Sequence, residues 1–189
     1  MTIGPGFDDV LAAAQTGAGW AVAILYRDLQ PGLLRYLQAK VPGQAEDLAS
    51  EVWLAAAPKL VAFEGDEVGF RNWIFTIAHR RVIDHIRKSA RRQTDPVDGM
   101  RFEQRAAADD TADAGIEEVS AREAIDALTA GLPADQAEVV LLRVVGGLGV
   151  DEVAQLMGRS AGSVRVLQHR ALRRMARRLA ATQDAAVTN

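Results

Sequence analysis

Apolar residues recur at intervals of three and four along most of the chain, which is the spacing of one face of an α-helix. The pattern runs from Phe7 to Ala57, resumes from Phe70 to Ile86, and returns from Ile116 to Leu179. No alternation of polar and apolar residues is long enough for a strand, and no internal repeat has a solenoid period. The sequence therefore predicts an all-α fold.

Prolines and glycines divide the first half of the chain. Pro31 and the pair Pro42-Gly43 predict breaks between three or four helices, because proline is tolerated in the first turn of a helix and Pro-Gly marks a turn. After a polar turn at residues 65–69, an apolar stripe predicts a helix that runs to Arg92. The stripe consists of Phe70, Trp73, Ile74, Ile77, Ala78, Val82 and Ile86.

A segment in the middle of the chain contains hardly any large apolar residues. Residues 93–115 are rich in alanine and aspartate and include Pro96 and Gly99. Low hydrophobicity with an excess of one charge is typical of a linker or flexible arm. We therefore expect two small helical domains, at 7–92 and 116–182, joined by an acidic flexible linker.

The charges are segregated, although the net charge is only −3. Residues 71–92 carry 7 basic side chains and 1 acidic one, residues 159–178 carry 7 and none, and residues 93–128 carry 3 and 10. The two cationic blocks are candidate footprints for a polyanion, because neutralising phosphates releases bound counterions. For either block alone, a solvated helix face is the alternative.

Composition excludes several kinds of site. The chain has no cysteine, which excludes disulfides, cysteine-ligated zinc, iron–sulfur clusters and thiol nucleophiles. No stretch approaches the roughly 18 consecutive apolar residues of a membrane span, and the N-terminus lacks the order of a signal peptide. The sequence predicts no cofactor, no metal site and a cytoplasmic location.

Residues 147–179 have the spacing of a helix-turn-helix motif. A short helix at 150–157 would end at Gly158, which can adopt the left-handed conformation, and Ser160 would cap a second, longer helix. The inward face of the second helix is predicted to consist of Val164, Leu167, Ala171, Leu172, Met175 and Leu179.

The outward face of that second helix is cationic. In this motif the N-terminal half of the second helix enters the major groove of DNA. Arg174, Arg177 and Arg178 are expected further along, near phosphates or solvent. A structural helical hairpin is the alternative, although seven arginines without an opposing acid disfavour it. The residues predicted at the DNA are Ser160, Ser163, Arg165, Val166, His169, Arg170 and Arg173.

Three stretches of the chain carry a resemblance to a known family. Residues 47–54 read Asp-Leu-Ala-Ser-Glu-Val-Trp-Leu, residues 70–87 belong to the helix that carries the first cationic block, and residues 132–178 contain the helix-turn-helix. In this order they resemble the core-binding motif of region 2, the promoter-melting and −10-reading helix, and region 4 of bacterial RNA polymerase sigma factors. The resemblance is to the extracytoplasmic-function group of the sigma-70 family and covers most of the chain.

The resemblance implies a non-catalytic specificity subunit that directs promoter-specific transcription initiation. Its expected partners are promoter DNA and core polymerase, through the β′ clamp and the β flap. Core packing is the alternative role for Trp53, and a buried anchor is the alternative for Trp73. The positions carried over for core-polymerase binding are Asp47, Leu48, Glu51 and Trp53, and those for the −10 element are Trp73, His79, Arg80, Asp84, Arg87 and Lys88.

The chain departs from the family pattern at Ser50, Arg80, Val166, Leu167 and Gln168. These departures prevent inference of the −35 sequence and of individual base contacts. The acidic linker either imitates a nucleic-acid backbone in the path of the nascent RNA or acts as a plain tether. Exposed cationic faces on both domains would also suit an acidic or amphipathic inhibitor, so an anti-sigma protein stays open as a partner.

Two other function classes would each account for part of the sequence. A conventional helix-turn-helix regulator explains residues 147–179 but leaves residues 44–92 without a role, and no phosphate-binding glycine loop or α/β alternation indicates a regulatory domain there. A nuclease or metal site would need His79, Asp84 and His85 together. Their spacing does not place them on one helix face in the i, i+4 manner of a metal-binding pair.

Overall fold

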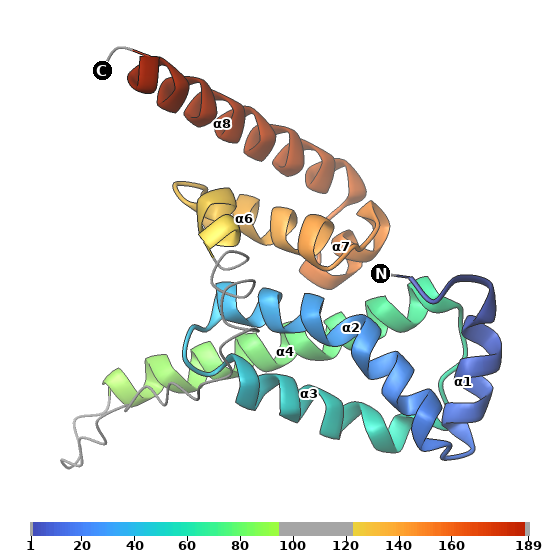
Figure 1. Ribbon diagram of the computed structural model, residues 1–189. Helices are drawn as coiled ribbons and strands as arrows, with labels where there is room; N and C mark the ends of the chain where they lie inside the picture. Colours follow the sequence, from blue (N-terminus) through green and yellow to red (C-terminus); the bar gives the residue numbers. More distant parts are fainter. Residues whose placement is uncertain (1, 95–122, 188–189) are drawn as a thin grey trace. The chain divides into compact units, whose positions relative to one another are not determined.

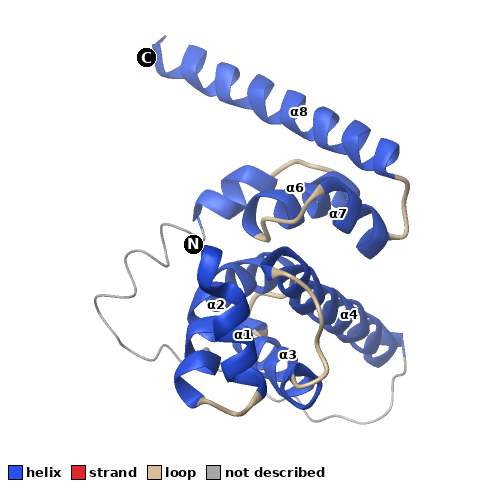
Figure 2. Ribbon diagram, turned by 90° about the vertical axis from the view of Figure 1, so that its right-hand side faces the viewer, coloured by secondary structure: helices blue, strands red, loops and turns tan. Residues whose placement is uncertain are grey.

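The computed structural model describes residues 2–94 and 123–187, and their regular structure is helical throughout (Figures 1 and 2). The chain divides into two compact units, with the second beginning at Glu123. The prediction of an all-α fold with two small helical domains is confirmed.

The predicted linker, residues 93–115, lies outside the described residues except for its first two, which are helical. The predicted domain limits, 7–92 and 116–182, stay predictions.

The described part of the N-terminal unit consists of a short 3-10 turn followed by helices. They are η1 Gly4–Gly6, α1 Phe7–Gln15, α2 Gly19–Lys40, α3 Ala45–Leu60 and α4 Glu67–Thr94. Helix α2 packs against α1, α3 and α4, and α3 also packs against α4. Helix α2 is therefore the central element of this unit.

The hydrophobic core of the N-terminal unit comes mainly from α2 and α4. Burying a large apolar side chain of this kind contributes about 1.5–3 kcal/mol. The largest side chains that are almost completely buried are Leu25, Leu33, Tyr36 and Leu37 of α2, Val52 of α3, and Ile74, Phe75 and Val82 of α4.

The predicted break at Pro31 is wrong, because α2 runs through this residue without interruption. An interior proline costs a helix about 3 kcal/mol, since it removes one backbone hydrogen bond and its ring crowds the preceding turn. Leu29 and Leu33 flank Pro31 and are 3% and 0% exposed, and Leu37 one turn later is also 0% exposed. Their burial outweighs the cost of the proline. Pro31 itself lies on the exposed side of the helix.

The apolar stripe of α4 is confirmed in its first part only. Phe70, Ile74, Ala78 and Val82 are buried, whereas Ile86 is 48% exposed. The C-terminal part of α4 extends beyond α2 and α3, so it has no helix of this unit to pack against (Figure 1).

A polar network fixes the start of α4. Asp66 caps the helix, since its Oδ1 accepts a hydrogen bond from the backbone N–H of Gly69 at 2.8 Å. The carboxylate of Glu67 accepts hydrogen bonds from the backbone of Ile3 and Gly4 at 2.8 and 2.9 Å. These contacts hold the first residues of the chain against the bundle.

The described part of the C-terminal unit is built around its last helix. Residues 123–129 are helical. They are followed by α6 Ala134–Val140, a π-helical turn η2 Leu141–Val145, α7 Val150–Met157 and α8 Ala161–Val187. Both α6 and α7 pack against α8. The helix predicted to follow Pro133 is confirmed, and Pro133 is the residue that precedes α6.

The inward face predicted for α8 is narrower than expected. Val164 and Ala171 are completely buried, but Leu172 and Leu179 are 50% and 67% exposed. Helices α6 and α7 cover only the strip of α8 centred on Val164 and Ala171. The prediction that Leu172 and Leu179 point inward is therefore wrong.

Candidate nucleic-acid interface

The turn between α7 and α8 has the predicted geometry. Gly158 adopts a left-handed conformation with φ of 64°, and the N–H of Arg159 donates to the carbonyl of Ala154 at 2.9 Å. The Ser160 hydroxyl accepts a hydrogen bond from the backbone N–H of Ser163 at 3.2 Å. Glycine ends the first helix and serine caps the second, as the sequence predicted.

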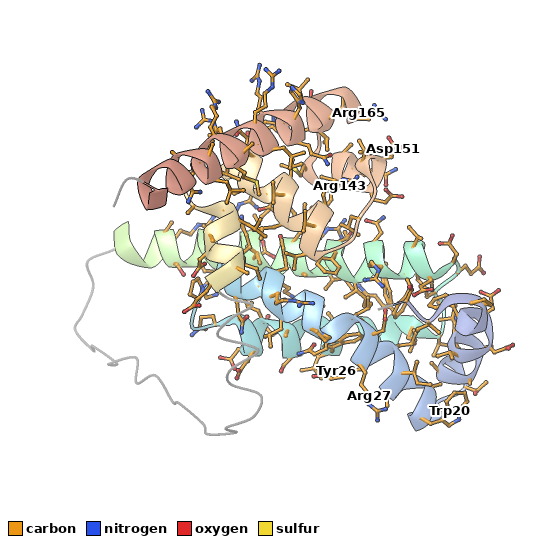
Figure 3. All side chains as sticks on the ribbon, turned by 45° about the horizontal axis from the view of Figure 1, so that its top comes forward. Trp20, Tyr26, Arg27, Arg143, Asp151 and Arg165 are labelled. Atoms are coloured by element: carbon orange, nitrogen blue, oxygen red, sulfur yellow. The ribbon has the colours of Figure 1, made fainter. Side chains whose placement is uncertain are left out.

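The residues predicted to face DNA all lie on the surface of α8 or at its start. The buried residues Val164 and Ala171 mark the opposite side of the helix. Nitrogen-tipped side chains project from α8 away from α6 and α7, with Arg165 near the start of the helix (Figure 3). The exposed residues are Ser160, Ser163, Arg165, Val166, His169, Arg170 and Arg173.

The arginines of this block fall into two groups. Arg159 forms an ion pair with Asp135, and the Arg178 guanidinium donates to the carbonyls of Ala127 and Ala130. These two side chains hold α8 against the preceding helices. In the described part of the chain, by contrast, no acidic side chain pairs with the second group, which consists of Arg165, Arg170, Arg173, Arg174 and Arg177.

Another arginine organises the loop before the helix-turn-helix. Arg143 lies in the π-helical turn, and its Nη1 donates to the carbonyl of Leu148 at 2.5 Å. The N–H of Leu148 donates back to the carbonyl of Leu142 at 3.1 Å. Leu148 is 1% exposed, so this loop is anchored in the hydrophobic core of the unit where α7 begins.

Helix α4 presents a second cationic surface. Arg80, Asp84 and Arg87 are exposed and follow one another at intervals of four and three, so they share one face, with exposed Lys88 beside it. Among the described residues, no ion pair neutralises Arg80, Arg87 or Lys88.

His79 lies closer to the core than these neighbours. It is half-buried, and its Nδ1 lies 3.0 Å from the hydroxyl oxygen of Tyr36 on α2. The structure therefore places His79 beside the cationic face of α4 but ties its ring to the bundle interior.

Trp73 takes part in an aromatic cluster. Its ring stacks on Phe63 with centroids 5.1 Å apart and an interplanar angle of 28°, and it lies 5.7 Å from the ring of Phe70. Trp73 is half-buried. This position suits the buried-anchor alternative for Trp73, and its stacking on a DNA base stays a prediction.

Helix α3 presents its predicted residues on two sides. Asp47 and Glu51 are exposed, while Leu48 is 4% exposed and belongs to the hydrophobic core. Trp53 is half-buried, and its indole N–H donates to Oε1 of Gln30 at 2.7 Å. Leu48 therefore supports the helix from inside, and the docking role of all four residues stays a prediction.

Several contacts between helices of the N-terminal unit could not be found from sequence spacing. Glu51 pairs with Arg81 at 3.6 Å, and Arg71 pairs with Asp28 at 3.0 Å across 43 residues of sequence. The Tyr36–His79 contact also joins residues 43 apart. Such pairs depend on how the helices pack, for which a single sequence gives no periodic signal.

Two further findings concern other kinds of site. In residues 2–94 and 123–187, no three histidine or acidic side chains lie close enough to hold a metal ion. The same residues include no helix with the length and hydrophobicity needed to span a membrane.

Two stretches of the chain match models of known families. Residues 25–92 match sigma-70 region 2, and residues 122–175 match sigma-70 region 4. The ECF RNA polymerase sigma factor SigD of Mycobacterium tuberculosis is 32% identical over 187 residues, which are 96% of this chain and 87% of that protein. This chain belongs to the ECF sigma factors. It is an RNA polymerase sigma factor of the kind that directs promoter-specific initiation.

Other relatives agree with this assignment. The ECF RNA polymerase sigma factor BldN of Streptomyces coelicolor is 34% identical over 173 residues, and the match covers 90% of this sigma factor but 65% of BldN. The solved structure of CnrH in complex with the cytosolic domain of CnrY has a TM-score of 0.59 at 21% identity and covers 91% of this chain and 96% of CnrH. At that identity the likeness establishes the fold.

Proposed function

We propose that this sigma factor binds core polymerase through α3, holds the non-template strand of the −10 element on α4, and reads the −35 element with α8. The observation that carries this proposal is the row of exposed arginines on α8 that no acid within the described part of the C-terminal unit neutralises. Such a row is unfavourable for an isolated surface and favourable against phosphates.

For the −35 element, α8 would enter the major groove with its N-terminal half. Arg165 and Arg170 can donate to guanine or to phosphates, and Val166, which is 49% exposed, can pack against a thymine methyl group. Arg173 lies one turn further along and suits a phosphate contact. Ser160 and Ser163 lie where the helix begins, and helix N-termini favour phosphate groups.

For the −10 element, α4 supplies cations along one face and one acid among them. Arg80, Arg87 and Lys88 would contact backbone phosphates of the separated strand. The Asp84 carboxylate lies between Arg80 and Arg87 in the sequence and could accept a hydrogen bond from an exocyclic amino group of a base. Aromatic stacking would come from Trp73 only if its contact with Phe63 is given up.

For core polymerase, the exposed acids of α3 are the proposed contacts. Asp47 and Glu51 would face the β′ clamp, with Trp53 at the edge of the surface and Leu48 holding the helix from inside. We further propose region 2 at residues 7–92, region 4 at residues 116–182 with a contact to the β flap, and a non-catalytic role for the whole chain.

We also propose an inhibitor as a partner. RpoE, solved in complex with the anti-sigma factor NepR from Bartonella quintana, has a TM-score of 0.59 to this chain at 20% identity, which supports a shared fold. The exposed cations of α4 and α8 would suit an acidic inhibitor. In this proposal the sigma factor acts in the cytoplasm, on the nucleoid once it is bound to polymerase, and the acidic segment at 93–115 connects its two regions.

The docking surface can be tested by reversing its charges. Asp47→Lys combined with Glu51→Lys should abolish co-purification with core polymerase. A matched control reverses Asp8 and Asp9, two exposed acids in the first turn of α1, and should leave co-purification intact. Equal retention of the two double variants would remove Asp47 and Glu51 from the docking surface.

The reading of the −35 element is tested separately with Arg165→Ala. This variant should transcribe a −35-dependent promoter poorly and bind core polymerase normally. Normal transcription from that promoter would show that the DNA-facing side of α8 has been assigned wrongly.

A further inference from the structure

Helix α2 holds the indole of Trp53, a residue of α3, at two points. The indole N–H donates to Oε1 of Gln30 at 2.7 Å, and the ring of Tyr26 lies against the indole with centroids 5.1 Å apart and an interplanar angle of 45°. Tyr26 and Gln30 are four residues apart on α2 and therefore share one face of that helix. The orientation of the indole is thus set by contacts from the neighbouring helix.

The hydrogen bond between Trp53 and Gln30 has only one possible direction. An indole N–H is a donor and never an acceptor, so it is the oxygen of the Gln30 amide that faces it. Both side chains are half-buried. The bond therefore lies at the border between the helical bundle and solvent, and it orients a ring that is still partly accessible to a partner.

Trp53 also forms part of the wall of an apolar cavity in the N-terminal unit. The cavity has a volume of about 350 Å³, and its lining includes Tyr26, Ala57 and Trp73. A closely packed interior holds a side chain by contacts on every side, and a cavity removes those contacts on one side. Without Gln30 the indole has room to rotate toward this space and away from the surface of α3. The hydrogen bond therefore supplies orientation that packing alone does not.

This orientation matters because Trp53 lies at the edge of the proposed docking surface. Asp47 and Glu51 are exposed and share one face of α3, since they are four residues apart. The contacts with Gln30 and Tyr26 place Trp53 on the side of α3 that is next to α2. A large aromatic side chain that is already ordered loses less freedom when a partner protein binds it.

We propose that Gln30 is a positioning residue for docking on core polymerase. Its amide oxygen holds the Trp53 indole so that the accessible part of the ring meets polymerase, and Gln30 acts through Trp53 rather than on polymerase itself. This inference rests on the proposed docking role of α3.

The positioning step can be measured without polymerase. The chain has three tryptophans, so proton–nitrogen-15 NMR of the free full-length chain gives one indole N–H signal for each, and Trp53→Phe identifies the signal of Trp53. In Gln30→Leu this signal should move upfield, and its exchange with water should be about fivefold faster, because one hydrogen bond is lost. Gln30→Glu keeps an acceptor oxygen at the same position and should retain the wild-type behaviour. An indole signal that is unchanged in Gln30→Leu would overturn the inference.

The consequence for docking is measured as the affinity of the full-length chain for core polymerase. Gln30→Leu should weaken binding about fivefold, which corresponds to one lost hydrogen bond, and Gln30→Glu should restore it. Trp53→Ala should weaken binding further, because it also removes the ring. The double variant Gln30→Leu and Trp53→Ala should bind no worse than Trp53→Ala alone, because the two residues act as one unit. If Gln30→Leu weakens binding equally in the Trp53→Ala background, Gln30 does not act through Trp53.

A packing control separates positioning from a loss of structure. Val52 of α3 is 0% exposed, and Val52→Ala loosens the same pair of helices without removing either hydrogen-bonding group. This variant should leave the Trp53 indole signal and, after correction for the folded fraction, the affinity for polymerase unchanged. A loss of affinity equal to that of Gln30→Leu would mean that Gln30 is merely structural.

The charge reversal of Asp47 and Glu51 separates failure of this inference from failure of the proposed function. If the reversal abolishes docking while Gln30→Leu and Trp53→Ala bind like the wild type, only the positioning role of Gln30 is overturned. If the reversal and Trp53→Ala both leave docking intact, the proposed docking role of α3 has failed, and the positioning role of Gln30 fails with it.

Discussion

Replacing single arginines of α8 separates those that contact DNA from those that hold the C-terminal unit together. Arg173 and Arg178 are both exposed, lie on the same helix and carry the same charge. Arg178 donates to the carbonyls of Ala127 and Ala130, whereas the side chain of Arg173 forms no hydrogen bond or ion pair with the described residues. Arg173→Gln and Arg178→Gln therefore each remove one positive charge, but the first removes a proposed DNA contact and the second removes hydrogen bonds within the unit.

The expected magnitudes follow from these roles. Each phosphate contact contributes about 0.9 to the slope of log affinity against log salt concentration. Arg173→Gln should reduce the magnitude of that slope by about 0.9. The factor by which the variant binds DNA more weakly than the wild type should therefore shrink about 3.5-fold when the salt concentration is raised fourfold. Arg178→Gln should leave the slope unchanged and destabilise the C-terminal unit by about 0.5 kcal/mol, because its bonds cap an exposed helix end.

The assay is binding of the reconstituted holoenzyme to a duplex promoter fragment at several salt concentrations, with thermal unfolding of the free chain measured in parallel. The reasoning fails if the two variants change the slope equally, or if Arg178→Gln changes it and Arg173→Gln does not. Either result would mean that internal hydrogen bonding does not identify the arginines that face DNA.

Three further substitutions test local features of the fold. Gly158→Val should destabilise the C-terminal unit by about 1–2 kcal/mol in thermal unfolding because of its left-handed backbone, while Gly158→Asn should cost less. Ser160→Ala removes the cap that binds the N–H of Ser163 and should cost about 1 kcal/mol by urea unfolding, and no loss would show that water replaces the cap. Asp28→Ala removes the carboxylate that lies 3.0 Å from the guanidinium of Arg71, whose side chain is 17% exposed, and should destabilise the N-terminal unit by about 3 kcal/mol. A loss below about 1 kcal/mol would show that the remaining neighbours of Arg71, among them Glu67 at 3.9 Å, compensate for Asp28.

Local signals in the sequence predicted the helix-turn-helix well. The conformation of Gly158 and the cap at Ser160 depend on neighbours within three or four residues, so the residue types themselves carry the information. The exposed positions of α8 were predicted for the same reason, because helical periodicity fixes which residues share a face.

Predictions that depended on neighbouring helices were less successful. Leu172 and Leu179 belong to an apolar stripe by spacing, but whether they are buried depends on how far α6 and α7 reach across α8. The break expected at Pro31 failed because the burial of Leu29 and Leu33 on either side outweighs the local cost of proline.

The candidate site shows the same difference between features set by neighbours in the sequence and features set by other helices. The resemblance to sigma factors pointed to Arg80, Asp84 and Arg87, which the structure places on one exposed face of α4, but it could not reveal that His79 contacts Tyr36 in another helix. The charge count also treated the arginines of residues 159–178 as one block, whereas Arg159 and Arg178 are engaged within their own unit. A charge count cannot make that distinction, because it depends on partners 24 to 51 residues away.

Reconstituted transcription tests the central claim most directly. The purified chain and sigma-free bacterial core polymerase are incubated with a library of promoter fragments, and the 5′ ends of the transcripts are sequenced. We predict discrete start sites whose templates share two spaced upstream elements, with the wild-type chain required for every one of them. A chain that neither binds core polymerase nor produces such starts would contradict this account and favour a DNA-binding regulator that acts without polymerase.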